Sequence, residues 1–104
     1  QVMPSAVATF KHDIKDRAKL NRQVHLSIDN IIDEFGGSSL KFKEGNDIVD
    51  FSFSIGGIKL SGEVLLFEDY IEVKVKLPLI GIAMKGMVIE SLNKLVPPYL
   101  EEQS

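Results

Sequence analysis

Two short stretches decide the fold: VDFSFSI, residues 49–55, and YIEVKVKL, residues 70–77. In both stretches apolar and polar residues alternate with a period of two. Successive side chains of a β-strand point to opposite faces of the sheet. Each strand therefore has one apolar face and one polar face, a pattern typical of an antiparallel sheet that is covered on one side only.

The flanking sequence extends this sheet. Residues 40–43 and 58–67 also alternate, and residues 5–12 are expected to form a further strand before them. Short polar links separate the later strands: residues 44–47, Gly56-Gly57 and Glu68-Asp69. Such links are too short for crossover helices, so we expect these four strands to form a meander.

Two segments have helical periodicity instead. The first is Asp16–Phe35, with Asp13 expected to cap its start and Gly36-Gly37 to end it. The second is Ile80–Leu95, and Val96-Pro97-Pro98 should stop it. Its expected apolar stripe comprises Ile80, Met84, Met87, Val88, Leu92 and Leu95.

The predicted order is β-α-β-β-β-β-α, an α+β fold with an antiparallel sheet and both helices on one face. It is similar to a reduced helix-grip arrangement, in which a curved sheet wraps a long C-terminal helix. The 104 residues should form one domain, with residues 1–5 and 99–104 as flexible tails.

Composition excludes several classes of function. The chain has no cysteine, which excludes disulfides, zinc–thiolate sites and thiol nucleophiles. No apolar run is long enough for a transmembrane helix, and no signal peptide is recognisable, so we expect a cytoplasmic protein. We expect no cofactor.

Few residues suggest catalysis or metal binding. His25 has Asp29 four residues later, which is typical of an exposed helix pair, and His12 is expected to be a polar residue near a helix start. A metal site would need a third ligand nearby. Glu68 and Asp69 are interpreted as solvated turn residues. We therefore expect no catalytic site and no metal site.

The polar sheet face is rich in lysine but poor in aromatic residues. Platforms for single-stranded nucleic acid need outward aromatic side chains for base stacking, and only Tyr70 is available. A solvated face with cross-strand charge pairs is the better interpretation, and no nucleic-acid partner is expected. The residues concerned are Lys11, Lys41, Lys43, Lys59, Lys74, Lys76, Asp50, Glu63 and Glu72.

Residues 77–84, LPLIGIAM, contain more apolar side chains than one helix stripe can bury. The excess either remains exposed, as at a partner or lipid-like surface, or is tucked into the core. The candidate binding residues are Leu79, Ile80, Met84, Lys85 and Met87.

The strand YIEVKVKLP at residues 70–78, the pair Lys85-Gly86 and the pair Ile89-Glu90 resemble the closing block of the polyhydroxyalkanoic acid system family, also called the granule-region family. The strand that ends in His12, followed by Ile14 and a long helix, is similar to the family's opening. The helix start Lys15-Asp16-Arg17-Ala18 departs from the acidic-alanine start that is usual there. The resemblance implies a link to storage polyester granules and no catalytic residues.

Three functions follow as hypotheses. The first is a non-enzymatic accessory protein associated with polyhydroxyalkanoate granules, which would dock through the excess apolar surface. The alternative is a binding module for an apolar or acyl ligand, in a pocket lined by Phe51, Phe53, Val73, Met84 and Met87. An enzyme ranks third, because no nucleophile, base and orienting group come together. A homodimer is a further hypothesis, since it would cover the edge strands of an open sheet.

Overall fold

The computed structural model describes residues 5–78 and 83–101. Along the chain the elements are β1 (Ser5–Lys11), α1 (Arg17–Glu34), β2 (Ser38–Gly45), β3 (Ile48–Ile55), β4 (Ile58–Leu66), β5 (Tyr70–Lys76), α2 (Lys85–Leu95) and α3 (Pro97–Leu100). The predicted α+β class and its order of strands and helices are confirmed, with α3 as an added helical turn.

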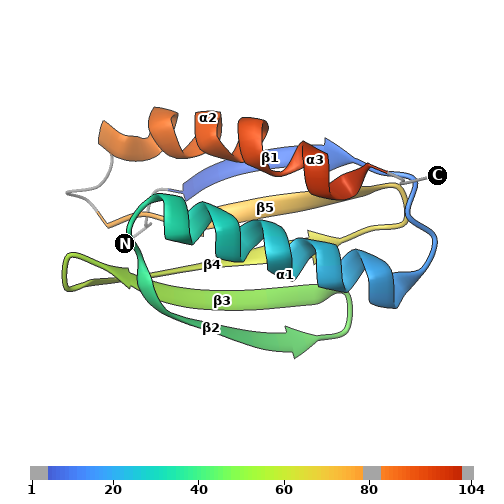
Figure 1. Ribbon diagram of the computed structural model, residues 1–104, viewed down its shortest axis with the longest axis horizontal. Helices are drawn as coiled ribbons and strands as arrows, with labels where there is room; N and C mark the ends of the chain where they lie inside the picture. The colour runs from blue at the N-terminus through green and yellow to red at the C-terminus, as the bar shows by residue number, and fades with distance from the viewer. Residues whose placement is uncertain (1–4, 79–82, 102–104) are drawn as a thin grey trace.

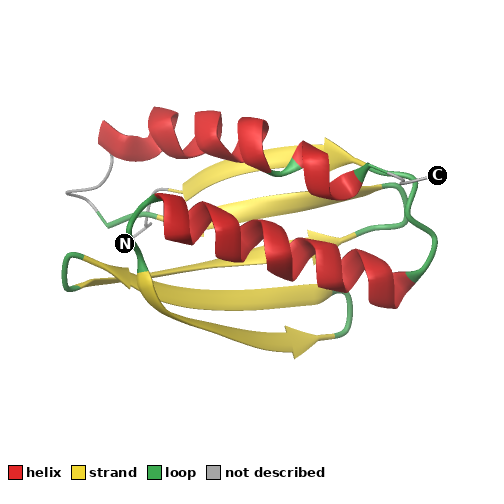
Figure 2. Cartoon of the chain, in the orientation of Figure 1, coloured by secondary structure: helices red, strands yellow, loops and turns green. Residues whose placement is uncertain are grey.

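The strands form a single antiparallel sheet in the order β1-β5-β4-β3-β2. Strands β2 to β5 follow one another as the predicted meander, and β1 lies beside β5. Figures 1 and 2 show the helices in one layer over a single face of the sheet. We call the face covered by the helices the inner face and the opposite face the outer face.

The register across the sheet explains the alternation in the sequence. Val49, Val64 and Val73 pair across β3, β4 and β5, and all three side chains are buried on the inner face. Between them along each strand lie outer-face residues such as Asp50 and Glu72, which contact solvent. Burial of the inner row provides the main stabilisation of the sheet, at about 1.5–3 kcal/mol for each large apolar side chain.

Helix α1 buries the face that its periodicity predicts. The buried side chains are Leu20, Val24, Ser27, Ile28, Ile31 and Ile32. The predicted cap was wrong: Asp16, and not Asp13, accepts hydrogen bonds from the backbone N–H groups of Ala18 and Lys19. Residues 12–15 are not helical, because the chain must first cross from the end of β1 to the start of α1.

Helix α2 has a narrower apolar stripe than expected. Val88 and Leu92 are buried, whereas Met84 is 39% exposed to solvent and Met87 is 55% exposed. The prediction that Met87 belongs to the buried stripe and faces the sheet was therefore wrong. Ile80, the expected first member of the stripe, lies outside the described residues.

The C-terminal segment also differs from the prediction. Helix α2 ends at Leu95 as predicted, but Pro97 and Pro98 begin the short helix α3, which includes residues 99 and 100 of the predicted tail. Proline is well tolerated in the first turn of a helix, where its missing N–H has no partner to lose. Leu100 is buried, and Gln23 of α1 donates a hydrogen bond from Nε2 to the carbonyl oxygen of Tyr99 at 2.9 Å. Residues 99 and 100 therefore belong to the packed structure.

Candidate functional site

An apolar pocket of about 190 Å³ lies between the inner face of the sheet and helices α1 and α2. The second half of α1 forms one wall, the start and middle of α2 form the other, and strands β3, β4 and β5 form the floor. Its lining residues are Ile28, Ile31, Ile32, Phe35, Phe51, Phe53, Ile55, Ile58, Leu60, Val75, Leu77, Pro78, Met84, Val88 and Leu92.

The sheet register shows which end of the pocket is open. The cross-strand pairs Ile55–Ile58 and Phe53–Leu60 line it, and so does the row that contains Phe51. Exposure rises along this series: Phe51 and Phe53 are buried, Leu60 is partly buried, and Ile58 is 41% exposed. The pocket therefore opens at the β3–β4 hairpin.

The exposure of the lining residues on the helices also increases toward the β3–β4 hairpin. On α1, Ile28 is buried and Phe35, two turns later, is partly exposed. On α2, Leu92 is buried, and the exposed Met84 lies just before the first turn. Figure 1 shows that α1 ends and α2 begins on the side of the β3–β4 hairpin, so the exposed ends of both walls lie together.

The opposite end of the pocket is closed. Val49, Val64 and Val73 form the next inner row of the sheet, and none of them lines the pocket. Their exposure is 0 or 1%, so this row is a packed core layer behind the pocket. The pocket is thus a blind apolar channel.

The β3–β4 hairpin at the open end has the geometry of a tight two-residue turn. Gly56 and Gly57 both have positive φ, at 55° and 82°. Such turns match the twist of the flanking strands, and glycine adopts this conformation without a steric cost. The turn fixes Ile55 and Ile58 opposite each other at the entrance.

The sequence predicted part of this lining. Phe51, Phe53 and Met84 line the pocket as expected, whereas Val73 lies behind it and Met87 faces solvent. Among the candidate binding residues, Lys85 is exposed directly after Met84, and Leu79 and Ile80 lie outside the described residues.

Sequence reasoning missed the α1 wall and the β4 contribution. Ile58 and Leu60 were visible as inner-face positions of an alternating strand, and that pattern could have placed them on the floor. The three α1 residues and the C-cap Phe35 could not have been assigned, because the spacing between helix and sheet is not encoded in a local pattern.

Among the residues that the structure describes, every side chain that lines the pocket is apolar. An ion inside it would lose its hydration without gaining a partner, which is strongly unfavourable. The pocket can therefore hold an apolar group.

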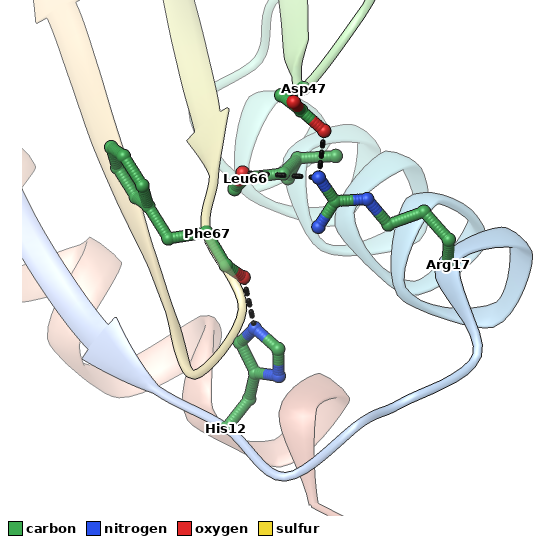
Figure 3. A network of polar contacts seen from close by, with 5 residues as sticks. All are labelled: His12, Arg17, Asp47, Leu66 and Phe67. Carbon is green, nitrogen blue, oxygen red and sulfur yellow. Dashed lines mark hydrogen bonds and ion pairs between the residues drawn. The ribbon is translucent and has the colours of Figure 1, made fainter.

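His12 has a structural role that its sequence position did not reveal. It is buried, and its Nδ1 accepts a hydrogen bond from the Ile14 N–H at 3.1 Å. The other nitrogen, Nε2, therefore carries the proton and donates to the Phe67 carbonyl oxygen at 3.2 Å (Figure 3). His12 thus joins the end of β1 to the β4–β5 connection, and both of its nitrogens are engaged.

Beside it, Arg17 joins the start of α1 to the far end of the sheet. Its guanidinium donates to the Asp47 carboxylate and to the Leu66 carbonyl oxygen (Figure 3). These contacts lie at the end of the sheet opposite the pocket entrance. They hold α1 firmly where the pocket is closed.

The expected helix pair of His25 with Asp29 was wrong. His25 Nδ1 lies 2.7 Å from the Asn21 carbonyl oxygen, and Nε2 lies 3.1 Å from the Glu44 carboxylate on β2. The imidazole also packs against Phe42, with ring centroids 4.2 Å apart. His25 therefore connects α1 with the edge strand β2.

The remaining polar candidates lie on the surface. Glu68 and Asp69 are exposed between β4 and β5, as the turn interpretation predicts. The lysines of the predicted polar face are likewise partly or fully exposed. Across the outer face, the register places Lys74 opposite Glu63 and Lys43 opposite Asp50, so opposite charges lie on neighbouring strands.

Two further findings concern the described residues alone. Within residues 5–78 and 83–101, no three His, Asp or Glu side chains gather closely enough to hold a metal ion. No helix in these same ranges is long and apolar enough to cross a membrane.

No protein-family model, curated protein or solved structure matches this chain. The blind apolar channel between sheet and helices is therefore the feature on which a functional proposal rests.

Proposed function

We propose that this protein is a non-catalytic binding module that holds the apolar part of a small ligand in the channel between the sheet and helices α1 and α2. The observation that carries the proposal is the lining itself. All fifteen lining side chains in the described part of the chain are apolar, and the buried row Val49, Val64 and Val73 closes one end of the space.

The packing of the core supports this proposal. Protein interiors are close-packed, so an apolar space of about 190 Å³ between sheet and helices departs from ordinary core packing. An apolar ligand there would gain van der Waals contacts with the lining and remove apolar surface from water.

The size of the space limits the ligand. A cavity of ~150 Å³ with an apolar lining is known to admit benzene, a group of six carbons. By proportion, the present pocket would admit about eight carbons. A medium-length acyl chain or a substituted ring fits this volume, whereas a sterol or a long lipid does not.

Calorimetric titration with octanoate and 1-octanol tests the proposal. The wild-type protein should bind both, with a negative heat-capacity change because apolar surface is buried. Val88→Phe should abolish binding, since the added ring would occupy the pocket from the α2 wall. Val7→Phe is the matched control, because Val7 is exposed on β1 and does not line the pocket. Absence of binding by the wild-type protein would refute the proposal.

A second candidate is association with the surface of a polyester storage granule. The exposed Met84 and Met87 favour it, because two neighbouring apolar side chains at the start of α2 could insert into an apolar surface. Co-sedimentation with isolated granules at high salt tests this idea. Met87→Glu should release the protein while leaving octanoate binding intact, since Met87 does not line the pocket. Equal retention of the variant would count against this surface.

A further inference from the structure

We infer that the ligand is a single unbranched chain that enters tail first at the β3–β4 hairpin, and that Phe51 and Gly62 set the longest chain that fits. This inference rests on the proposed function and narrows it to a ligand class. It also assigns a specificity-determining role to two residues deep in the sheet.

The shape of the pocket favours a chain over a compact ring. Phe51 and Ile55 both line it and lie four residues apart on β3, a span of about 13 Å at ~3.3 Å per residue. A volume of about 190 Å³ spread over this length makes a narrow channel. An extended aliphatic chain fills such a channel, whereas a ring would leave much of it empty.

The direction of entry follows from polarity. The closed end is surrounded by buried apolar side chains, so a polar head group there would be left without hydrogen-bond partners. At the hairpin end, Ile58 and Met84 are partly exposed, and the charged Lys59 and Lys85 lie next to them in the chain. The head group therefore remains in water at the hairpin end, and the tail points toward Phe51.

The depth of the channel depends on a close contact between Phe51 and Gly62. These residues pair across β3 and β4, and Gly62 pairs in turn with Val75 of β5. A Cβ atom placed on Gly62 would lie 2.4 Å from Cζ of Phe51 and 2.5 Å from the carbonyl oxygen of Lys74 on β5. The phenyl ring therefore lies directly over the glycine, in space that any other residue would occupy.

This contact keeps the ring down on the sheet. A side chain at position 62 would have to displace both the ring and the Lys74 backbone carbonyl, and a ring displaced toward the helices would shorten the channel. Phe51 and Val75 are the innermost lining residues of the sheet, because the next row is closed. The row Phe51–Gly62–Val75 is therefore where the ligand tail stops.

The length limit can be estimated in two ways. The volume gives about eight carbons by comparison with a benzene-binding cavity. The 13 Å span gives about eleven, because an extended chain advances ~1.2 Å per bond, one third of the ~3.3–3.6 Å per residue of an extended polypeptide. The two estimates place the limit at about eight to eleven carbons.

A series of straight-chain carboxylates from butanoate to dodecanoate tests this inference by calorimetry, below their micelle concentrations. Affinity should rise about fourfold for each added carbon, the fold-change that corresponds to ~0.8 kcal/mol per buried methylene. It should stop rising between about eight and eleven carbons. A continuous rise to dodecanoate, or no dependence on length, would overturn the inference.

Phe51→Leu extends the test. Removal of the ring should move the limit to longer chains by about two carbons. Phe10→Leu is the matched control, because Phe10 is also buried on the inner face but does not line the pocket, and its limit should equal that of the wild type. An unchanged limit in Phe51→Leu would contradict the assigned role. The wild-type series remains decisive if the variant does not fold.

The outcomes separate this inference from the proposed function. If no carboxylate or alcohol binds, both fail. If octanoate binds and Val88→Phe abolishes binding, but affinity has no length limit, the pocket is a binding site and only the inferred stop at Phe51 is wrong.

Discussion

Val75→Ile probes the space under the helices through the stability of the free protein. Val75 lies on β5 and lines the pocket, while Val73, the preceding inner-face residue of the same strand, lies in the closed row behind it. The two valines have the same backbone setting and nearly the same burial, at 7% and 1% exposure. They differ in whether there is space above the side chain.

The two substitutions should therefore change stability in opposite directions. At position 75 the added methylene enters the pocket and should stabilise the fold by about 0.8 kcal/mol. At position 73 the same methylene enters a packed layer, where overpacking typically costs ~1–3 kcal/mol. For a domain of this size, 1 kcal/mol corresponds to a shift in melting temperature of ~4–8 °C. Val75→Ile should then melt ~3–6 °C higher than the wild type, and Val73→Ile should melt lower.

Thermal and urea unfolding followed by far-UV circular dichroism measures both effects, since the chain has no tryptophan to report by fluorescence. The comparison requires ligand-free protein, because a bound ligand would itself raise the melting temperature. If Val75→Ile destabilises the protein as much as Val73→Ile does, the space beside Val75 is packed and the pocket is refuted.

Three further predictions concern single contacts. Asp16→Ala should destabilise the protein by about 1 kcal/mol because it removes the cap of α1. The control Asp13→Ala should change the free energy of unfolding by less than about 0.5 kcal/mol. Equal effects of the two variants in urea unfolding would contradict the assigned cap. His12→Ala should lower the free energy of unfolding by ~1–3 kcal/mol, because the Ile14 N–H and the Phe67 carbonyl lose their hydrogen-bond partner. Hydrogen exchange of the Ile14 amide should also become faster. Unchanged exchange would argue against the contact with Nδ1. Gly62→Ala should lower the melting temperature and weaken octanoate binding together, and tighter binding would show that the channel does not end there.

Much of the fold follows from local pattern. The period-two alternation of residues 49–55 and 70–77 predicted both strands and their inner faces. It also predicted the antiparallel sheet, in which each of the two strands pairs with β4. The 3.6-residue period of α1 predicted its buried face in the same way. These elements can be predicted because burial of one side imposes a simple repeat of apolar residues on the sequence.

Contacts between segments that are distant in the chain could not be predicted from the sequence. Asp13 and Asp16 are equally suitable caps by residue type, and the path from β1 to the helix decides between them. His25 has an acidic residue one turn away on its own helix, yet its partner is Glu44, which the sheet brings beside α1. In each case the local candidate was chemically reasonable, and tertiary geometry selected another.

The binding channel is also a product of tertiary geometry. Its residues are ordinary inner-face and helix-face positions, and nothing in their types distinguishes a lining residue from a core residue. Val73 was expected in the lining and Ile58 was not, because the lining depends on where α1 and α2 leave the sheet uncovered. A sequence pattern gives the direction of a side chain but does not give the distance to the opposite layer.

Intermolecular nuclear Overhauser effects between bound octanoate and the protein show directly where the ligand lies. We expect contacts from the terminal methyl group of the ligand to Phe51 and Val75, with the carbons next to the carboxylate near Ile58 and Met84. Contacts confined to Met87 or to the outer face of the sheet would contradict this expectation, because the ligand would then bind on the surface and leave the channel empty.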